Sequence, residues 1–253
     1  MNLHTESIGA GPDLVLLHGW GMHSGIWDGV REQLARHFRL CSVDLPGHGF
    51  SPVCEPVTLE RMVEVVADSL PASCIVCGWS LGGQVAIELA LREPARVRKL
   101  ALVSTTPCFA RREDWQWGMD VTALQLFMEN LKQDDKATMN RFLTLAASGG
   151  QGDAASVLAR LRKNFFQRNA PNAAVLQEGL QILLTSDLRK RLRGMTQHAI
   201  LLQGENDVIT DPGAARWMNQ QLQRSELIMF SGCGHAPFLS YPDQFVAGMV
   251  RLV

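Results

Sequence analysis

Short apolar runs recur along the chain, each bounded by glycine, proline or charged residues. Continuous apolar runs without polar alternation are typical of parallel strands that are buried on both faces of a sheet. The pattern therefore predicts strands at six places: Leu14–Leu17, Leu40–Val43, Ile75–Cys77, Leu100–Val103, Ile200–Leu202 and Leu227–Phe230.

Helical patterns lie between these runs. Behind Thr58, a favourable N-cap, apolar residues recur at the spacing of one helix face as far as Leu70. Similar stripes follow at Leu81–Leu89 and, after Pro242, at Phe245–Val250. This alternation predicts an α/β fold, with a mostly parallel sheet and helices on both of its faces.

The alternation is interrupted between residues 110 and 193, where the sequence shows no convincing strand. A helical block between strands is typical of a cap over one edge of a sheet. We therefore predict a core of residues 1–109 and 194–253, with a cap of residues 110–193 inserted in it. Four helices are expected in the cap, with a loop at Gly149, Gly150 and Gly152: Val121–Leu131, Lys136–Ala146, Ala154–Phe166 and Ala174–Leu184.

Composition and charge restrict the function without naming it. The chain has 253 residues, 46% of them apolar and 19% charged, with a net charge of −1 and a pI near 6.7. A chain of this length buries enough surface to fold without a metal or a disulfide. The lack of a basic excess argues against nucleic-acid binding. The sequence has neither a glycine-rich nucleotide motif nor metal-ligand spacing, so we expect no cofactor and no metal.

The first residues and the cysteines predict a cytoplasmic protein that does not bind membranes, and we also expect a monomer. The first residues lack the basic and apolar regions of a signal peptide, and no apolar run approaches the length of a membrane span. Two of the six cysteines, Cys74 and Cys77, form a CxxC pair inside a predicted strand. Residues three apart on a strand point to opposite faces. We therefore interpret the pair as core side chains in a reducing compartment.

The strongest chemical signal is Gly78-Trp79-Ser80-Leu81-Gly82-Gly83. It matches G-x-S-x-G, follows a predicted strand and opens a predicted helix, which is the context of a nucleophile elbow. So tight a turn leaves no room for side chains at positions 78 and 82. It would present the Ser80 hydroxyl at the carboxyl edge of the sheet and leave the Leu81 N–H available to an oxyanion. The alternative, a glycine-rich turn without chemistry, is disfavoured by the flanking elements.

A serine nucleophile needs a base, and His235 is the best placed of the seven histidines. It follows the last predicted strand, and loops after parallel strands converge on the edge that carries Ser80. The acid should come from the loop after the preceding strand, which offers Glu205 and Asp207. Asp211 precedes a proline and is better placed as a helix N-cap. We predict Asp207 as the acid, with Glu205 as the alternative.

A second oxyanion donor is expected from His18-Gly19-Trp20-Gly21, the loop after the first predicted strand. Glycine allows the backbone to approach a substrate, so the Trp20 N–H is the natural partner of the Leu81 N–H. We expect the His18 side chain to brace this loop. Trp20 and Trp79 flank the site, where either could line an apolar acyl pocket. For Trp79 a place in the core is an equally good interpretation.

These motifs, with the segment Asp44-Leu45-Pro46-Gly47-His48-Gly49-Phe50-Ser51 and the order Ser80, Asp207, His235, resemble the α/β-hydrolase superfamily over the whole chain. A narrower resemblance is to the carboxylesterases of biotin synthesis, which hydrolyse the methyl ester of pimeloyl-acyl carrier protein. It is carried by six stretches: His18–Met22, Gly78–Gly83, Thr106–Phe109, Gly179–Leu183, Asp187–Arg189 and His235–Phe238.

The resemblance implies a serine carboxylesterase that removes methanol from a carrier-bound acyl chain through an acyl-enzyme. It also implies that basic cap residues contact an acidic carrier protein. Arg141 and Arg160 occupy the comparable region, with Arg162 and Lys163 beside them. Phe142 and Leu145, on the predicted helix of Arg141, are expected to face inward and line the acyl channel.

The charge distribution supports an acidic partner independently. Residues 132–168 contain seven cationic and three acidic side chains, a local charge of +4, which leaves −5 for the rest of the chain. A basic cap on an acidic body is suited to docking an acidic protein beside the site. The alternative is an ordinary solvated helical surface.

Three other functions stay open at this point. A related serine hydrolase acting on small esters or carbon–carbon bonds would need no basic cap. A non-catalytic hydrolase-like binding protein would not be labelled at Ser80 by a serine-directed phosphonate, and an acyltransferase would pass the acyl group to an alcohol. Hydrolases with an aspartate nucleophile are disfavoured because this elbow carries serine.

Overall fold

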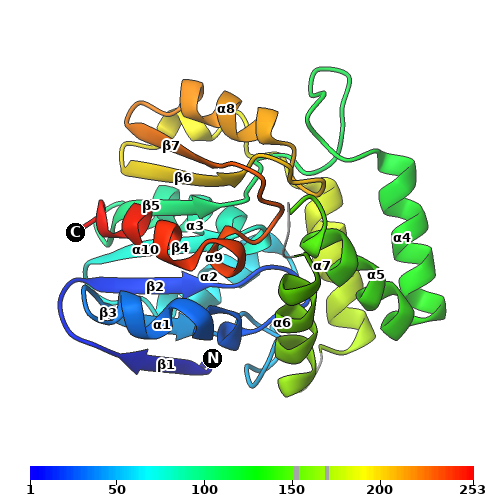
Figure 1. The fold of residues 1–253 in the computed structure, drawn as a ribbon, viewed down its shortest axis with the longest axis horizontal. Helices are drawn as coiled ribbons and strands as arrows, with labels where there is room; N and C mark the ends of the chain where they lie inside the picture. The colour runs from blue at the N-terminus through cyan, green and yellow to red at the C-terminus, as the bar shows by residue number, and fades with distance from the viewer. Residues whose placement is uncertain (151–153, 169–170) are drawn as a thin grey trace.

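The computed structural model describes residues 1–150, 154–168 and 171–253, so Gly152 and Asp153 of the predicted cap lie outside the described residues. A seven-stranded sheet forms the centre, in the order β1-β3-β2-β4-β5-β6-β7 (Figure 1). β1 is antiparallel to β3, and all other neighbours are parallel. The strands are β1 (Thr5–Ile8), β2 (Asp13–Leu17), β3 (Arg39–Val43), β4 (Cys74–Trp79), β5 (Val97–Val103), β6 (His198–Gly204) and β7 (Ser225–Phe230).

The predicted α/β fold is confirmed, and each of the six apolar runs lies within a strand. The central strands read as apolar runs because helices cover both of their faces; every residue of β4 is buried. The edge strand β1 was not predicted because its four residues are mostly exposed and form no apolar run.

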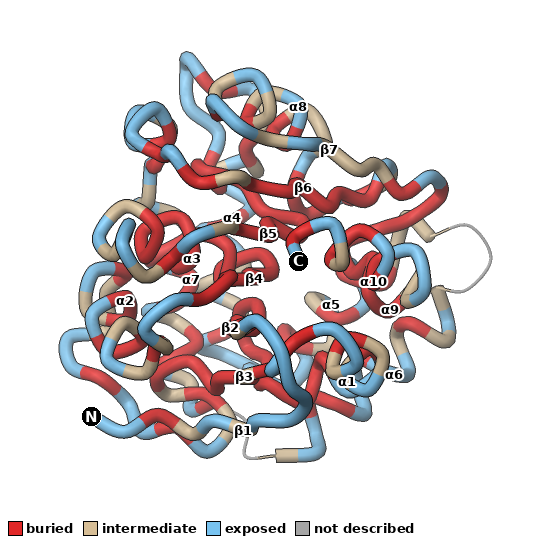
Figure 2. Tube along the Cα trace, turned by 90° about the vertical axis from the view of Figure 1, so that its left-hand side faces the viewer, coloured by how far each residue is buried: buried red, intermediate tan, exposed pale blue. Residues whose placement is uncertain are grey.

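Helices cover both faces of the sheet (Figures 1 and 2). They are α1 (Asp28–Leu34), α2 (Leu59–Asp68), α3 (Leu81–Arg92), α8 (Pro212–Gln221), α9 (Pro237–Ser240) and α10 (Pro242–Val250). α1 and α10 pack together on one face, α2 and α3 on the other, and α8 packs against β6 and β7. Two predicted N-caps are confirmed: Thr58 accepts a hydrogen bond from Arg61 N–H at 3.2 Å, and Asp211 from Gly213 N–H at 2.7 Å.

In the part of the chain that the structure describes, four α-helices lie between β5 and β6 and gather beyond the carboxyl ends of the strands, at the right of Figure 1. We refer to them as the cap helices: α4 (Val121–Gln133), α5 (Asp135–Ala147), α6 (Ala154–Gln167) and α7 (Ala173–Thr185). All four agree with the predicted helices to within two residues at either end. Among the described residues, no helix has the length and apolar character needed to cross a membrane.

Candidate active site

Ser80 joins β4 directly to α3 in a strained conformation, with φ 56° and ψ −115°. Such a φ costs a non-glycine residue about 1–3 kcal/mol, and strain of this kind concentrates at functional sites. A Cβ atom on Gly78 would lie 2.2 Å from Gly82 O, and one on Gly82 would lie 2.5 Å from His18 O. Both glycines are therefore required by the close approach of neighbouring backbone, as the elbow motif predicts.

His235 and Asp207 form a buried pair at the same edge of the sheet. His235 Nδ1 lies 2.8 Å from Asp207 Oδ2, and their side chains are 1% and 0% exposed. Burial raises the pKa of Asp207, but His235 and hydrogen bonds from Thr210 outweigh burial and leave the pKa below its usual value. Asp207 also accepts hydrogen bonds from Ile209 N–H at 2.8 Å and Thr210 Oγ1 at 2.6 Å. An ionised, fully bonded carboxylate therefore orients the imidazole.

Glu205, the alternative acid, does not reach His235. It is exposed, and its Oε2 accepts a hydrogen bond from Ser231 Oγ at 2.8 Å. The structure thus brings Asp207, and not Glu205, to the histidine.

Trp79 ties the elbow to the loop that carries His235. Its indole Nε1 donates to His235 O at 2.8 Å, and its ring centroid lies 5.4 Å from that of the imidazole. Trp79 is also fully buried against Phe238. Of the two interpretations of Trp79, the structure agrees with a place in the core. The hydrogen bond that holds the histidine loop next to Ser80 is a role that neither interpretation included. The sequence did not predict this hydrogen bond, although the position of Trp79 next to Ser80 made the residue a candidate for a role in the site.

His235 Nε2, the ring nitrogen remote from Asp207, is buried and has no hydrogen-bond partner within the described part of the chain. The N–H groups of Trp20 and Leu81 also lack an acceptor among the described residues. The loop that carries Trp20 lies against the elbow, because a Cβ atom on Gly19 would lie 3.0 Å from the Trp79 ring. An acceptor nitrogen, a strained serine and two available N–H donors suit acyl transfer.

The side chain of Trp20 belongs to the contact between core and cap helices. Its Nε1 donates to Leu176 O of α7 at 2.9 Å, and its ring meets Phe142 of α5 edge-on, with centroids 4.9 Å apart. A Cβ atom on Gly179 would lie 2.6 Å from the Trp20 ring, so α7 approaches this ring closely. Phe142 is half-buried, and the structure places it beside Trp20.

His18 braces the Trp20 loop, as expected. Its Nε2 accepts a hydrogen bond from Leu45 N–H at 2.9 Å, so Nδ1 carries the proton and donates to Gly19 O at 2.8 Å. Burial, assisted by His48, lowers the pKa of His18 to about 3. The ring therefore stays neutral and keeps one tautomer at neutral pH.

The predicted inward placement of Leu145 is wrong. Leu145 is 44% exposed and lines an open surface hollow with Arg141 and Arg162. Residues three apart on a helix differ by only about 60° around its axis. That difference is enough to leave Leu145 at the exposed edge of α5 while Phe142 contacts Trp20.

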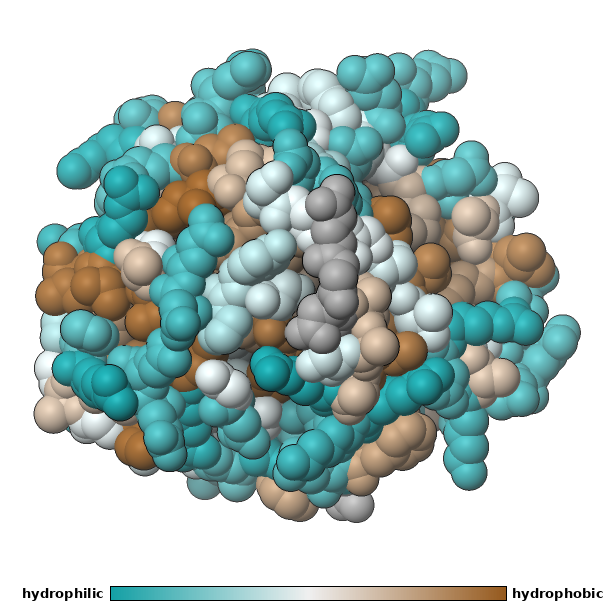
Figure 3. Space-filling model, viewed as in Figure 1, coloured by the Kyte–Doolittle hydropathy of each residue, from teal (hydrophilic) through white to brown (hydrophobic). Residues whose placement is uncertain are grey.

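The four predicted docking cations are exposed and lie on two sides of α6. Arg141 and Arg162 line the hollow at Leu145, whereas Arg160 and Lys163 line another beside α9. Within the described part of the chain, none of the four has an acidic partner within 4.0 Å. Figure 3 shows hydrophilic side chains at the lower right of this view, with apolar patches between them.

Arg168 departs from the basic surface that the charge count implied. It pairs with Asp44 at 2.9 Å and with Glu6 at 2.5 Å, so its charge is directed into the molecule. The positive charge available to a partner is therefore smaller than the sequence count.

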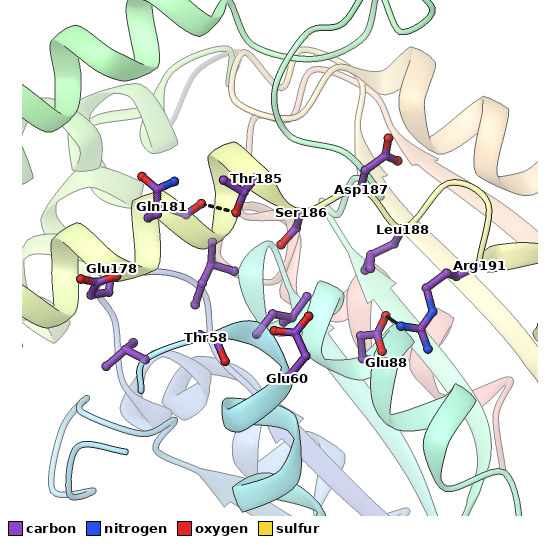
Figure 4. A pocket seen from close by; sticks show the side chains of 13 residues that line it. Thr58, Glu60, Glu88, Glu178, Gln181, Thr185, Ser186, Asp187, Leu188 and Arg191 are labelled. Carbon is purple, nitrogen blue, oxygen red and sulfur yellow. Dashed lines mark hydrogen bonds and ion pairs between the residues drawn. The ribbon is translucent and has the colours of Figure 1, made fainter. Parts of the chain in front are cut away.

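A separate cavity of about 350 Å³ lies between α2, α3 and α7 (Figure 4). Its most buried acid, Glu88, is 3% exposed and lies 2.9 Å from Arg191. Burial raises the pKa of Glu88, although Arg191 opposes that shift. Neither Ser80 nor His235 lines this cavity.

The CxxC pair is part of the core, as interpreted from the sequence. Cys74 and Cys77 are unpaired and buried in β4, and burial raises the pKa of the Cys74 thiol to about 12. Among the residues that the structure describes, no group of three or more His, Cys, Asp or Glu side chains is arranged to hold a metal ion.

Residues 14–248 match the family model described as alpha/beta hydrolase family. The chain belongs to this family. A solved esterase of the same fold, from Exiguobacterium antarcticum, superposes with a TM-score of 0.89 at 23% identity and covers 99% of this chain and 94% of its own.

Two closer relatives of this hydrolase bear the name pimeloyl-[acyl-carrier protein] methyl ester esterase. The protein from Nitrosospira multiformis is 57% identical over 99% of this chain and 98% of its own length. The protein from Nitrosomonas europaea is 58% identical over 97% of each chain. The resemblance to the biotin-synthesis carboxylesterases is therefore confirmed.

Proposed function

We propose that this hydrolase is a serine carboxylesterase that cleaves the methyl ester of pimeloyl-[acyl-carrier protein] in biotin synthesis and releases methanol. The observation that carries the proposal is the buried His235–Asp207 pair beside the strained elbow of Ser80. The Trp79 indole of that elbow donates a hydrogen bond to the backbone oxygen of His235. The relatives of that name, which match almost the whole chain, support the choice of substrate.

In the first half of the reaction, His235 Nε2 takes the proton of Ser80 Oγ, which attacks the carbonyl carbon of the methyl ester. The N–H groups of Trp20 and Leu81 hold the oxyanion, and each such donor contributes about 3 kcal/mol to the transition state. Asp207 stabilises the imidazolium ion and stays ionised throughout. The tetrahedral intermediate collapses, and methanol leaves with the proton from His235.

The second half repeats these steps in reverse order, with water in the place of methanol. His235 accepts a proton from water, which attacks the acyl-enzyme carbonyl, and the proton then returns to Ser80 Oγ as the carboxylate is released. The carrier protein stays attached to the far end of the acyl chain throughout.

The cap supplies the partner surface in this proposal. Arg141, Arg160, Arg162 and Lys163 are exposed cations suited to an acidic carrier protein, and residues 110–193 act as a cap on a core of residues 1–109 and 194–253. The protein acts as a monomer in this proposal. Six unpaired cysteines suit the reducing cytoplasm.

The test combines labelling with a comparison of two substrates. A serine-directed phosphonate is expected to label Ser80 and to leave the Ser80→Ala variant unlabelled. The carrier-bound methyl ester is expected to react faster than the free ester, and only the carrier-bound rate should fall with salt. An unlabelled Ser80 would overturn the enzyme, equal salt-independent rates would overturn carrier docking, and transfer to an added alcohol in preference to water would indicate an acyltransferase.

A further inference from the structure

Arg168 follows α6, and its guanidinium group extends from the cap helices into the core. Nη1 donates to Asp44 Oδ2 and to Ser24 Oγ, both at 2.9 Å, and Nη2 donates to Glu6 Oε1 at 2.5 Å. The guanidinium carbon also lies 4.9 Å from the centre of the Phe50 ring. With a side chain only 13% exposed, Arg168 joins the end of α6 to β1, to the 3-10 helix that begins at Ser24 and to the loop after β3.

Asp44 links Arg168 to the loop that follows β3 in the core. Its side chain is fully buried, and it also accepts hydrogen bonds from Ser24 N–H at 2.7 Å and Phe50 N–H at 3.0 Å. Removing one partner of a buried ion pair leaves an uncompensated charge. The arrangement of the loop from Asp44 to Phe50 therefore depends on how the end of α6 is seated.

The connection continues from Asp44 to the proposed oxyanion donor. The next residue, Leu45, donates its N–H to His18 Nε2, and His18 Nδ1 donates to Gly19 O. Gly19 O and the Trp20 N–H belong to one planar peptide unit, in which the two bonds point in opposite directions. Gly19 O also accepts a longer hydrogen bond from Met22 N–H, at 3.3 Å, so the 2.8 Å bond from His18 is the shorter of the two that set the direction of the Trp20 N–H.

The same residue is also held from the cap side. The Trp20 indole bonds to Leu176 O of α7, and Phe142 of α5 packs on its ring. The backbone of Trp20 is thus fixed through the core loop, and its side chain through the cap helices. A shift of the cap helices relative to the core would act on both.

We propose that Arg168 is a positioning residue that couples the seating of α6 to the orientation of the Trp20 N–H, through Asp44, Leu45 and His18. This inference rests on the proposed function, because it takes Trp20 as an oxyanion donor. When the guanidinium group is lost, the loop after β3 relaxes, the Gly19–Trp20 peptide turns, and acylation of Ser80 slows. Substrate binding depends on other groups and stays intact.

The test uses a small p-nitrophenyl ester, which does not require carrier docking. Arg168→Ala and Arg168→Lys are each expected to lower kcat about 10-fold or more, with KM within about 3-fold of wild type, because one oxyanion donor is misaligned. Lysine has a single ammonium group and cannot replace the planar fork. Millimolar guanidinium chloride, compared with sodium chloride, is expected to restore part of the activity of Arg168→Ala. Arg193→Ala, which removes an exposed arginine, is the matched control.

A second readout separates this route from a general structural role. Combining Arg168→Ala with His18→Asn is expected to cost little more than His18→Asn alone, because both act through one peptide unit. Wild-type kcat in the folded Lys variant, or losses that multiply in the double variant, would overturn the inference. If wild-type protein neither cleaves the ester nor reacts with the phosphonate, the proposed function itself fails; an active wild type with unaffected Arg168 variants refutes only the coupling.

Discussion

His235 Nδ1 and Asp207 Oδ2 lie 2.8 Å apart, and both side chains are shielded from solvent, so the carboxylate is held against the imidazole. Asp207→Asn keeps the shape of the side chain but cannot stabilise the imidazolium ion. We expect kcat to fall about 10⁴-fold while phosphonate labelling slows in parallel. Steady-state hydrolysis of a p-nitrophenyl ester measures the effect.

Glu205→Gln is the matched control for this prediction, since it changes the other acid of the same loop. Its side chain is exposed and contacts Ser231, so kcat should stay within about 2-fold of wild type. A large loss in Glu205→Gln and a small one in Asp207→Asn would reverse the assignment.

Trp79→Phe should separate the two roles of the tryptophan. Phenylalanine keeps most of the buried ring but cannot donate to His235 O. We expect kcat to fall about 10-fold, because small misplacements of a catalytic group slow the reaction strongly, with little change in KM. Circular dichroism should show an intact fold. An unchanged kcat would mean that the bond does not position the histidine.

The glycines of the elbow should be sensitive to a single methyl group. Gly78→Ala places its Cβ against Gly82 O, whereas Gly29→Ala in α1 meets no heavy atom within 4 Å. We expect Gly78→Ala to lower the free energy of unfolding by about 3 kcal/mol or more, and Gly29→Ala to change it by at most about 1 kcal/mol, in the stabilising direction. Equal stabilities in urea unfolding would contradict the geometry.

Buried histidines should make the fold sensitive to mild acid. Burial lowers the pKa of His48 from 6.5 to about 4, so between these values the unfolded chain binds a proton that the folded chain does not. The free energy of unfolding is therefore highest above pH 6.5. It falls as the pH is lowered toward 4, by up to about 1.4 kcal/mol per pH unit.

His48→Gln should flatten this dependence. Urea unfolding at pH 7 and pH 5 (about the middle of the window) measures the slope, with the exposed His37→Gln as the control. A variant that loses as much stability as wild type between the two pH values would show that His48 does not contribute.

Much of the fold and the chemistry could be predicted because both are encoded locally. The central strands appear as apolar runs, and the elbow compresses strand, turn and helix into six residues, Gly78–Gly83. His235 could be found from topology alone, since parallel strands deliver their loops to one edge. The edge strand β1 could not, because its exposed residues carry no burial pattern.

Other features depend on contacts between distant segments. Glu205 and Asp207 lie in one loop, and the sequence does not show which of them is buried. In the structure, Ile209 and Thr210 donate hydrogen bonds to Asp207, which satisfy its buried carboxylate. Arg168 counts as a surface charge in the sequence, yet it bonds to Asp44, which lies 124 residues earlier in the chain. Leu145 is apolar, as a residue of an acyl channel would be, but its side chain is exposed.

The central claim is that Ser80 attacks the methyl ester while the carrier protein remains attached to the acyl chain. Rapid mixing of enzyme with the carrier-bound methyl ester, followed by acid quench and intact-mass measurement, tests it directly. We predict an adduct in which the enzyme has gained the whole acyl-carrier protein less methanol, mapped by peptide analysis to Ser80 and absent from Ser80→Ala. Methanol release without any adduct at Ser80, or an adduct that persists in Ser80→Ala, would contradict the account.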